Sequence, residues 1–140
     1  MWIAYGYTDP LGLICKEHVE TKSMAKLEEL GYSGVRVTEN GGLDYSNSNA
    51  LYSKEGINPI IKIEYSGDYL TDFESASRQA LGQKSTPKGY VWHHLDDYDP
   101  VTNTGTMQLV ETPAHRDILH SGGVSQYKAA TGNSYIFKSW

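Results

Sequence analysis

The spacing of apolar residues along this chain predicts a mixture of short strands and helices. Residues 60–65 carry apolar side chains at every second position, which is typical of a strand with one buried face. Residues 22–30 carry them three residues apart and are followed by Gly31, which predicts a helix with a glycine stop. A short strand is expected at 34–38, and the polar stretch 43–58, rich in Asn and Ser, is expected to be a loop.

A second helix has the clearest start signal in the chain. Thr71 is followed three residues later by Glu74, which is the pattern of a capping box in which the two side chains satisfy each other's backbone N–H groups. The helix is predicted to continue to Leu81, and Gly82 supplies the left-handed residue at its end.

The second half of the chain is expected to hold a hairpin followed by a helix. Residues 89–92 read as a strand that delivers His93-His94 at its end, and residues 106–110 read as the return strand after an acidic loop. Thr112-Pro113 has the residue types of a helix N-cap and first turn, and that helix is predicted to end before Gly122. A hairpin and helix of this kind predict an α+β fold.

Composition sets limits on the class of protein. With 140 residues, 39% of them hydrophobic, the chain has the size of one ordinary domain, and its 11 Tyr suit a small core that keeps hydroxyl groups available. The single cysteine excludes an internal disulfide and a cysteine-rich zinc knuckle. No apolar run is long enough for a membrane span.

The net charge of −5 is unfavourable for a protein that binds nucleic acid, because phosphate contacts require Lys and Arg. The excess acid lies entirely in residues 1–83, where 7 Lys and Arg face 12 Asp and Glu. Residues 84–140 carry 5 of each and are neutral. A bound divalent cation would make this second part locally positive.

Four of the five histidines occur between positions 93 and 120, and this cluster is the candidate chemistry of the chain. Neutral imidazoles can hold a divalent ion, and an imidazole can also deprotonate water near neutral pH. Adjacent strand residues point to opposite faces, so His93 and His94 are expected to have different tasks. One would bind metal and the other would face the attacking water.

The spacing of the two later histidines is awkward for a helix. His115 and His120 are five residues apart, which is about 140° around an ideal helix, whereas two ligands on one face would be four apart. Either the last helical turn loosens before Gly122, or only His115 is a strong ligand.

Three segments of the second half closely resemble the WHH family of HNH/endonuclease VII-like toxin nucleases. The resemblance covers residues 89–123 and rests on the three segments Gly89-Tyr-Val-Trp-His-His-Leu95, Gly105-Thr-Met-Gln-Leu-Val110 and Ala114-His-Arg-Asp-Ile-Leu-His-Ser-Gly-Gly123. Upstream, Ile63-Glu-Tyr-Ser-Gly67 and Asp72-Phe73 also resemble the segment that precedes the WHH motif in such toxins.

This resemblance implies a ββα-metal, treble-clef-like core that cleaves DNA with one divalent ion (Mg²⁺, Mn²⁺, Ni²⁺ or Zn²⁺). It implies that His93 and His115 are metal ligands, that His120 is a ligand or a phosphate contact, and that His94 is the general base. Gln108 stands where many HNH enzymes have an Asn that braces the hairpin loop, so a structural role is expected for it.

Three further residues near these segments complete the expected site. Arg116, beside His115, is expected to contact the phosphate and assist catalysis, and Lys128 is a second candidate contact with nucleic acid. Trp92 is expected to support the hairpin core.

A second resemblance lies near the start of the chain. Asp9-Pro-Leu-Gly-Leu13 is similar to the motif that ends the core of Rhs/YD-repeat proteins, immediately before their variable toxin tip. It implies that residues 1–13 are a remnant of the carrier, that 14–88 form the N-terminal α/β extension of the toxin, and that 89–140 form the catalytic core and tail.

Together the two resemblances predict an interbacterial toxin that hydrolyses DNA. A bacterium would secrete it by type VI or similar contact-dependent delivery, and it would act in the cytoplasm of the target cell. Its partners would be the DNA substrate, an Rhs carrier before release and a cognate immunity protein. Two alternatives remain open: an RNase that uses the same site, and a non-catalytic binding module stabilised by metal.

Overall fold

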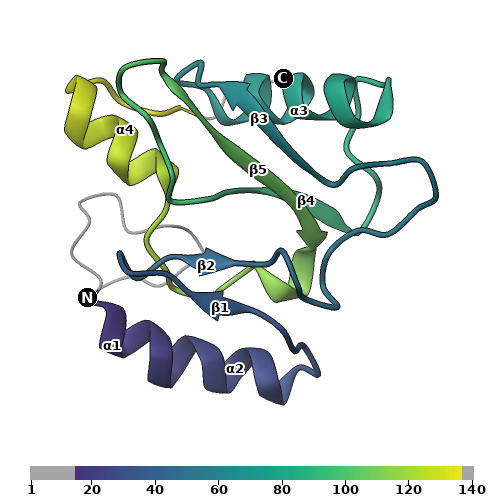
Figure 1. Ribbon diagram of the computed structural model, residues 1–140, viewed down its shortest axis with the longest axis vertical. Coiled ribbons are helices and arrows are strands. Elements are labelled where there is room, and N and C mark those ends of the chain that lie inside the picture. Colours follow the sequence, from purple (N-terminus) through teal and green to yellow (C-terminus); the bar gives the residue numbers. More distant parts are fainter. Residues whose placement is uncertain (1–14, 137–140) are drawn as a thin grey trace.

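The computed structural model describes residues 15–136, and within them the fold is α+β with two sheets (Figure 1). The first 13 residues, predicted to be a carrier remnant, lie outside the described residues. The N-terminal part contains a helix in three consecutive sections and a two-stranded antiparallel sheet. These elements are α1 (Lys16–His18), the π-helical turn Val19–Ser23, α2 (Met24–Glu29), β1 (Arg36–Val37) and β2 (Leu43–Asp44).

A three-stranded antiparallel sheet forms the centre of the molecule. Its strands are β3 (Ile60–Glu64), β4 (Tyr90–His94) and β5 (Thr104–Glu111), in the order β3-β5-β4. The strand predicted at 60–65 is one residue shorter, the strand predicted at 34–38 is reduced to the two residues of β1, and both hairpin strands are longer than predicted. In the register of the hairpin, His93 pairs with Gln108 and His94 pairs with Met107.

The central sheet is buried on both faces, and each face has its own core. Helices α3 (Tyr69–Leu81) and α4 (Gly123–Thr131) contribute to the core on one face, where Trp92, Met107 and Leu109 are buried. The core on the other face includes Val110 from the sheet and side chains from the N-terminal helix, from β2 and from the segment after β5. Successive residues of β4 and β5 therefore enter different cores.

The N-terminal helix begins six residues earlier than the predicted start at Lys22, at Lys16. Val19, Ser23 and Leu27 form its buried stripe, at intervals of four residues. The serine interrupts the apolar pattern in the sequence, yet its hydroxyl is satisfied by donating to the carbonyl of Leu119 at 2.5 Å. Because Ser23 is polar, the apolar spacing in the sequence did not extend the predicted helix back to Lys16.

The cap predicted for α3 is also wrong. Asp68 is the N-cap, and its carboxylate accepts hydrogen bonds from the backbone N–H groups of Leu70 and Thr71. Thr71 and Glu74 lie inside the helix and do not form a capping box. The end was predicted correctly, because Gly82 adopts the left-handed conformation with φ of 69°.

The helix predicted from Thr112 to before Gly122 is not formed. Residues 112–114 make one 3₁₀ turn, and Asp117 has a φ of +61°, which no α-helix tolerates. The helix of the hairpin-and-helix core is α4, which starts at Gly123, directly after the histidines. The ββα order is kept, but His115 and His120 lie in the connection between β5 and α4 and not on a helix.

None of the helices between residues 15 and 136 is long and apolar enough to cross a membrane.

Candidate metal centre and its flanking histidine

Three imidazole rings converge on one face of the central sheet. His93 comes from the end of β4, and His115 and His120 come from the connection after β5. Their ring centroids form a nearly equilateral triangle with sides of 4.9, 5.0 and 5.1 Å. One nitrogen from each ring lies within 4.8 Å of the other two, so the three could share a single ion.

The hydrogen bonds of two of these rings leave one nitrogen of each without a partner. His93 uses Nε2 to contact the carbonyl oxygen of Leu43 at 2.7 Å, and His120 uses Nδ1 to contact that of Ile118 at 2.6 Å. A carbonyl oxygen can only accept, so the proton of each neutral ring lies on that nitrogen. The other nitrogens, Nδ1 of His93 and Nε2 of His120, are buried lone pairs without a partner.

Burial keeps the three rings neutral near pH 7. It lowers the pKa of His120 from 6.5 to about 4, and the pKa values of His93 and His115 are also well below 6.5. Burial is the largest cause in each case, and proximity to His120 is the next for the other two rings. Neutral rings with an anchored N–H and an unpartnered lone pair are what a metal ion requires of histidine ligands, so the site fits a divalent cation.

The connection that carries His115 and His120 is held on both sides. The hydroxyl of Tyr45 donates to the carbonyl of Ala114 at 2.7 Å, immediately before His115. After His120, the backbone N–H of Ser121 donates to the carbonyl of Gly41 at 2.9 Å. Because the backbone between these two hydrogen bonds is not helical, His115 and His120 can both point toward His93 although they are five residues apart.

Gln108 fixes the segment that faces His93. Its side chain is fully buried, accepts from the backbone N–H of Tyr45 at 2.9 Å, and donates to the carboxylate of Asp44 at 2.8 Å and to the hydroxyl of Ser46 at 3.1 Å. The braced segment supplies the carbonyl of Leu43 and the ring of Tyr45 that both contact His93. Gln108 braces β2 and the residues after it, and not the hairpin loop as expected.

His94 is turned to the opposite face of the sheet, as strand alternation predicts. Its ring lies on the α3 side, where Nε2 is 2.9 Å from the buried carboxylate of Asp72. Four aromatic side chains lie around it with centroid distances of 5.2 to 6.0 Å, namely Tyr65, Tyr69, Phe73 and Tyr135. The structure therefore does not bring His94 into the triangle of His93, His115 and His120. It is still near enough to add to the lowering of the pKa of His115.

The remaining predicted residues lie outside the triangle. Trp92 is buried in the α3-side core and donates its indole N–H to the hydroxyl of Ser77 at 2.9 Å. Arg116 is exposed and lines an open pocket of about 580 Å³ together with Lys26 of α2. Lys128 is half-buried on α4.

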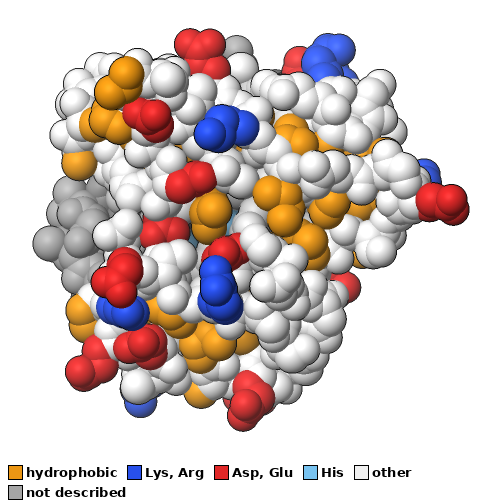
Figure 2. All heavy atoms as spheres, viewed as in Figure 1, with side chains coloured by type: hydrophobic (Ala, Val, Ile, Leu, Met, Phe, Trp, Pro, Cys, Tyr) orange, Lys and Arg blue, Asp and Glu red, His pale blue; other side chains and the backbone are white. Residues whose placement is uncertain are grey.

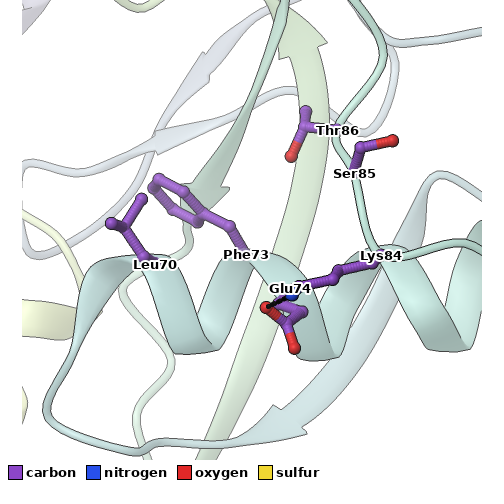
Figure 3. Close-up of a pocket in the computed structure, with 6 residues that line it drawn as sticks. All are labelled: Leu70, Phe73, Glu74, Lys84, Ser85 and Thr86. Atoms are coloured by element: carbon purple, nitrogen blue, oxygen red, sulfur yellow. Dashed lines mark ion pairs between the residues drawn. The ribbon is translucent and has the colours of Figure 1, made fainter. Parts of the chain in front are cut away.

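Surface charge is mixed on the face drawn in Figure 2. Basic side chains of the described part of the chain are scattered among acidic ones there. A pocket of about 350 Å³ beside α3 is lined by Phe73, and Glu74 and Lys84 form an ion pair across it at 3.8 Å (Figure 3). Neither described pocket is lined by a histidine of the triangle.

Sequence reasoning missed Asp72 as a partner of the histidine pair. It lies 22 positions before His94, and the sequence predicted only that it belongs to a helix. The one available signal was the resemblance of Asp72-Phe73 to the segment before the WHH motif, which assigned no role to the carboxylate. In the acidic loop after β4, Asp96 is buried and its carboxylate accepts from the hydroxyl of Thr38 at 2.5 Å.

An α+β fold with a hairpin followed by a helix, and with three histidines that converge on one face of the hairpin, is consistent with an HNH-type nuclease. In agreement, residues 82–130 match a family described as a nuclease of the HNH/ENDO VII superfamily with conserved WHH. The matched range contains β4, β5, all three histidines of the triangle and most of α4. No curated protein and no solved structure matches the chain. The family match supports a nuclease.

Proposed function

We propose that this protein is a metal-dependent endonuclease that holds one divalent ion with His93, His115 and His120. The observation that carries the proposal is the pair of buried, unpartnered ring nitrogens that belong to two of these histidines. An unpartnered buried polar atom destabilises the fold by about 1–3 kcal/mol, and two in one cluster indicate a missing common partner.

The donor set favours a transition metal over Mg²⁺. Three neutral imidazoles with no carboxylate among them suit Zn²⁺ or Ni²⁺, whereas Mg²⁺ requires oxygen ligands. When bound, the ion would stabilise the negative charge that develops on the phosphate and the leaving oxygen. Three protein ligands leave coordination positions open for substrate.

The chain's own residues would supply binding and proton transfer. We assign to His94 the role of general base, because it adjoins a ligand and its Nε2–H can be held by a carboxylate, which leaves Nδ1 as a proton acceptor. Exposed Arg116, next to His115, would contact a phosphate at the rim of the site, and Lys128 would add a more distant contact.

A plasmid-nicking assay tests the proposal. The purified protein should nick supercoiled plasmid with Zn²⁺, Ni²⁺ or Mn²⁺, and EDTA should abolish the cleavage. His93→Ala should lose both metal binding and cleavage, whereas His94→Ala should lose cleavage and keep most of its metal affinity in calorimetry. His18→Ala, which replaces a histidine of α1 outside the cluster, is the matched control and should remain active.

The outcomes separate the possible functions. Cleavage of RNA without cleavage of DNA would establish the RNase alternative. Metal binding without cleavage of either nucleic acid, in any of the ions including Mg²⁺, would leave a metal-stabilised binding module and refute the enzyme. An active His94→Ala variant would refute the base assignment alone.

We further propose that the substrate is DNA in competing bacteria and that the protein is a toxin tip. Support comes from the resemblance of the second half to toxin nucleases and of residues 9–13 to the end of an Rhs core. Expression in the bacterial cytoplasm should then degrade the chromosome, His93→Ala should be harmless, and a neighbouring immunity gene should restore growth. Growth of wild-type expressing cells with intact DNA would contradict the toxin role.

A further inference from the structure

Asp72 is a buried carboxylate surrounded by donors on both of its oxygens. Its side chain has no exposed surface. Oδ1 accepts from the backbone N–H of Ser66 at 3.0 Å and from the hydroxyl of the same residue at 2.7 Å. Oδ2 lies 2.9 Å from Nε2 of His94 and accepts from the hydroxyl of Tyr135 at 2.5 Å.

These contacts decide which nitrogen of His94 carries the proton. A carboxylate oxygen accepts hydrogen bonds, so Nε2 of His94 carries a proton, and in the neutral ring the lone pair is therefore on Nδ1. A neutral ring held in this way presents one defined atom, Nδ1, as its proton acceptor.

We infer that Asp72 is a positioning residue for the proposed nuclease reaction, which acts by holding His94 as the Nε2–H tautomer with Nδ1 as the proton acceptor. The inference rests on the proposed function for its catalytic consequence. Its structural half, the tautomer, stands on the contacts of Asp72 alone.

The carboxylate of Asp72 and its donors come from separate parts of the chain. The turn after β3 supplies Ser66, helix α3 supplies Asp72 itself, and the segment after α4 supplies Tyr135. The last segment is pinned by two backbone hydrogen bonds, from Tyr69 to the carbonyl of Ile136 and from Ile136 to the carbonyl of Gly67. Burial and the carboxylate raise the pKa of Tyr135, so its hydroxyl keeps its proton and remains a donor.

Replacement of Asp72 by asparagine separates orientation from packing, because the two side chains have the same shape. The backbone N–H of Ser66 can only donate, so the amide oxygen of the substituted side chain must take the place of Oδ1. The amide NH₂ group then takes the place of Oδ2 and donates to Nε2 of His94. The ring is forced into the Nδ1–H tautomer, and the proposed acceptor atom is lost.

The experiment combines nuclear magnetic resonance with kinetics. Long-range ¹H–¹⁵N spectra of the EDTA-treated wild type at neutral pH should show the Nε2–H tautomer for His94, and Asp72→Asn should show the Nδ1–H tautomer. With metal restored, Asp72→Asn should lower kcat by about 10²–10⁴-fold while KM changes less than about threefold, as when the carboxylate partner of a catalytic histidine is amidated.

Asp97→Asn is the matched control. It makes the same change at an exposed carboxylate that accepts from the N–H and hydroxyl of Thr106 and contacts no histidine. We expect it to leave the His94 tautomer unchanged and kcat within about twofold of the wild type.

Each result bears on the inference. A wild-type His94 in the Nδ1–H form, a tautomer that stays Nε2–H in Asp72→Asn, or a switched tautomer with unchanged kcat would overturn it. The wild-type spectrum decides the first point even if Asp72→Asn does not fold. A wild type that shows the expected tautomer but cleaves neither DNA nor RNA refutes the proposed function and leaves the structural half supported.

Discussion

Acidification should destabilise the metal-free protein by an amount that can be worked out for His120. Its pKa is 6.5 in an unfolded chain and about 4 in the fold, because the ring is completely buried. Above pH 6.5 the ring is neutral in both states and the full stability is present. Below that value the unfolded chain binds the proton first, so stability is lost as the pH falls from 6.5 toward about 4.

The size of the effect follows from the two pKa values. Each pH unit in this window costs about 1.4 kcal/mol, so His120 alone removes about 2 kcal/mol between neutral pH and about pH 5. His93 and His115 act in the same direction, since their pKa values are lowered too. Against a typical stability of about 5–15 kcal/mol, this loss is large.

The loss of unfolding free energy can be measured by urea unfolding in EDTA at about pH 8 and about pH 5. The wild type is compared with His120→Asn. Asparagine places its NH₂ group near the position of Nδ1 and can still donate to the carbonyl of Ile118, but it does not titrate. The variant should lose at least about 2 kcal/mol less than the wild type between the two pH values, whatever its stability at pH 8, because proximity to His120 also contributes to the lowered pKa values of His93 and His115. Titrating carboxylates contribute equally to both proteins and cancel.

His18→Asn is the matched replacement, on a helix that does not contribute to the triangle of histidines. It controls for the effect of replacing histidine by asparagine outside the triangle. Equal losses for His120→Asn and the wild type, within about 0.5 kcal/mol, would refute the conclusion that His120 is buried in its neutral form.

Three other changes should have measurable effects. Gln108→Leu keeps the side-chain volume but leaves the backbone N–H of Tyr45 without an acceptor, so the free energy of unfolding should fall by about 2–4 kcal/mol in urea. The same variant should weaken metal binding about tenfold in calorimetry, because the segment that orients His93 loses its brace; unchanged affinity would contradict that role. Gly123→Ala would place a Cβ 2.6 Å from the carbonyl oxygen of Leu95, so we expect a loss of about 1–3 kcal/mol, and a variant as stable as the wild type would show that α4 shifts freely. Zn²⁺ at about 100 times its Kd should stabilise the wild type by about 2.7 kcal/mol in thermal unfolding, and no change in Tm would argue against the metal site.

Polar side chains take up part of the buried core of this protein. Hydrogen-bonded polar side chains such as Gln108, Asp72 and Ser77 occupy core positions that a simpler domain would fill with aliphatic residues. A buried polar network of this kind holds its members in one arrangement when every partner is present. In this protein the network leads from both faces of the sheet to the histidine pair of β4.

Strand periodicity and residue type were sufficient to predict a large part of the architecture. The alternation in 60–65, the hairpin at 89–110 and the glycine that ends α3 are local features, and each was readable because it depends on neighbours within a few residues. Alternation along β4 also predicted that His93 and His94 would face opposite sides of the sheet. That prediction is confirmed, because each ring belongs to a different core environment.

Only the tertiary structure decided how the remaining histidines meet and what holds them. The residue types of Thr112-Pro113 suit the start of an α-helix and the start of a 3₁₀ turn equally well. In the structure they start a 3₁₀ turn, and distant residues such as Tyr45 contact the non-helical connection that follows. Backbone carbonyls orient His93 and His120, and a carboxylate orients His94. Nothing in the types of these residues indicates that they contact a histidine. The sequence determined which residue types were available and on which face each strand residue lies. Their use as ligands or partners depends on long-range packing, because hydrogen-bond geometry exists only once separate segments are in contact.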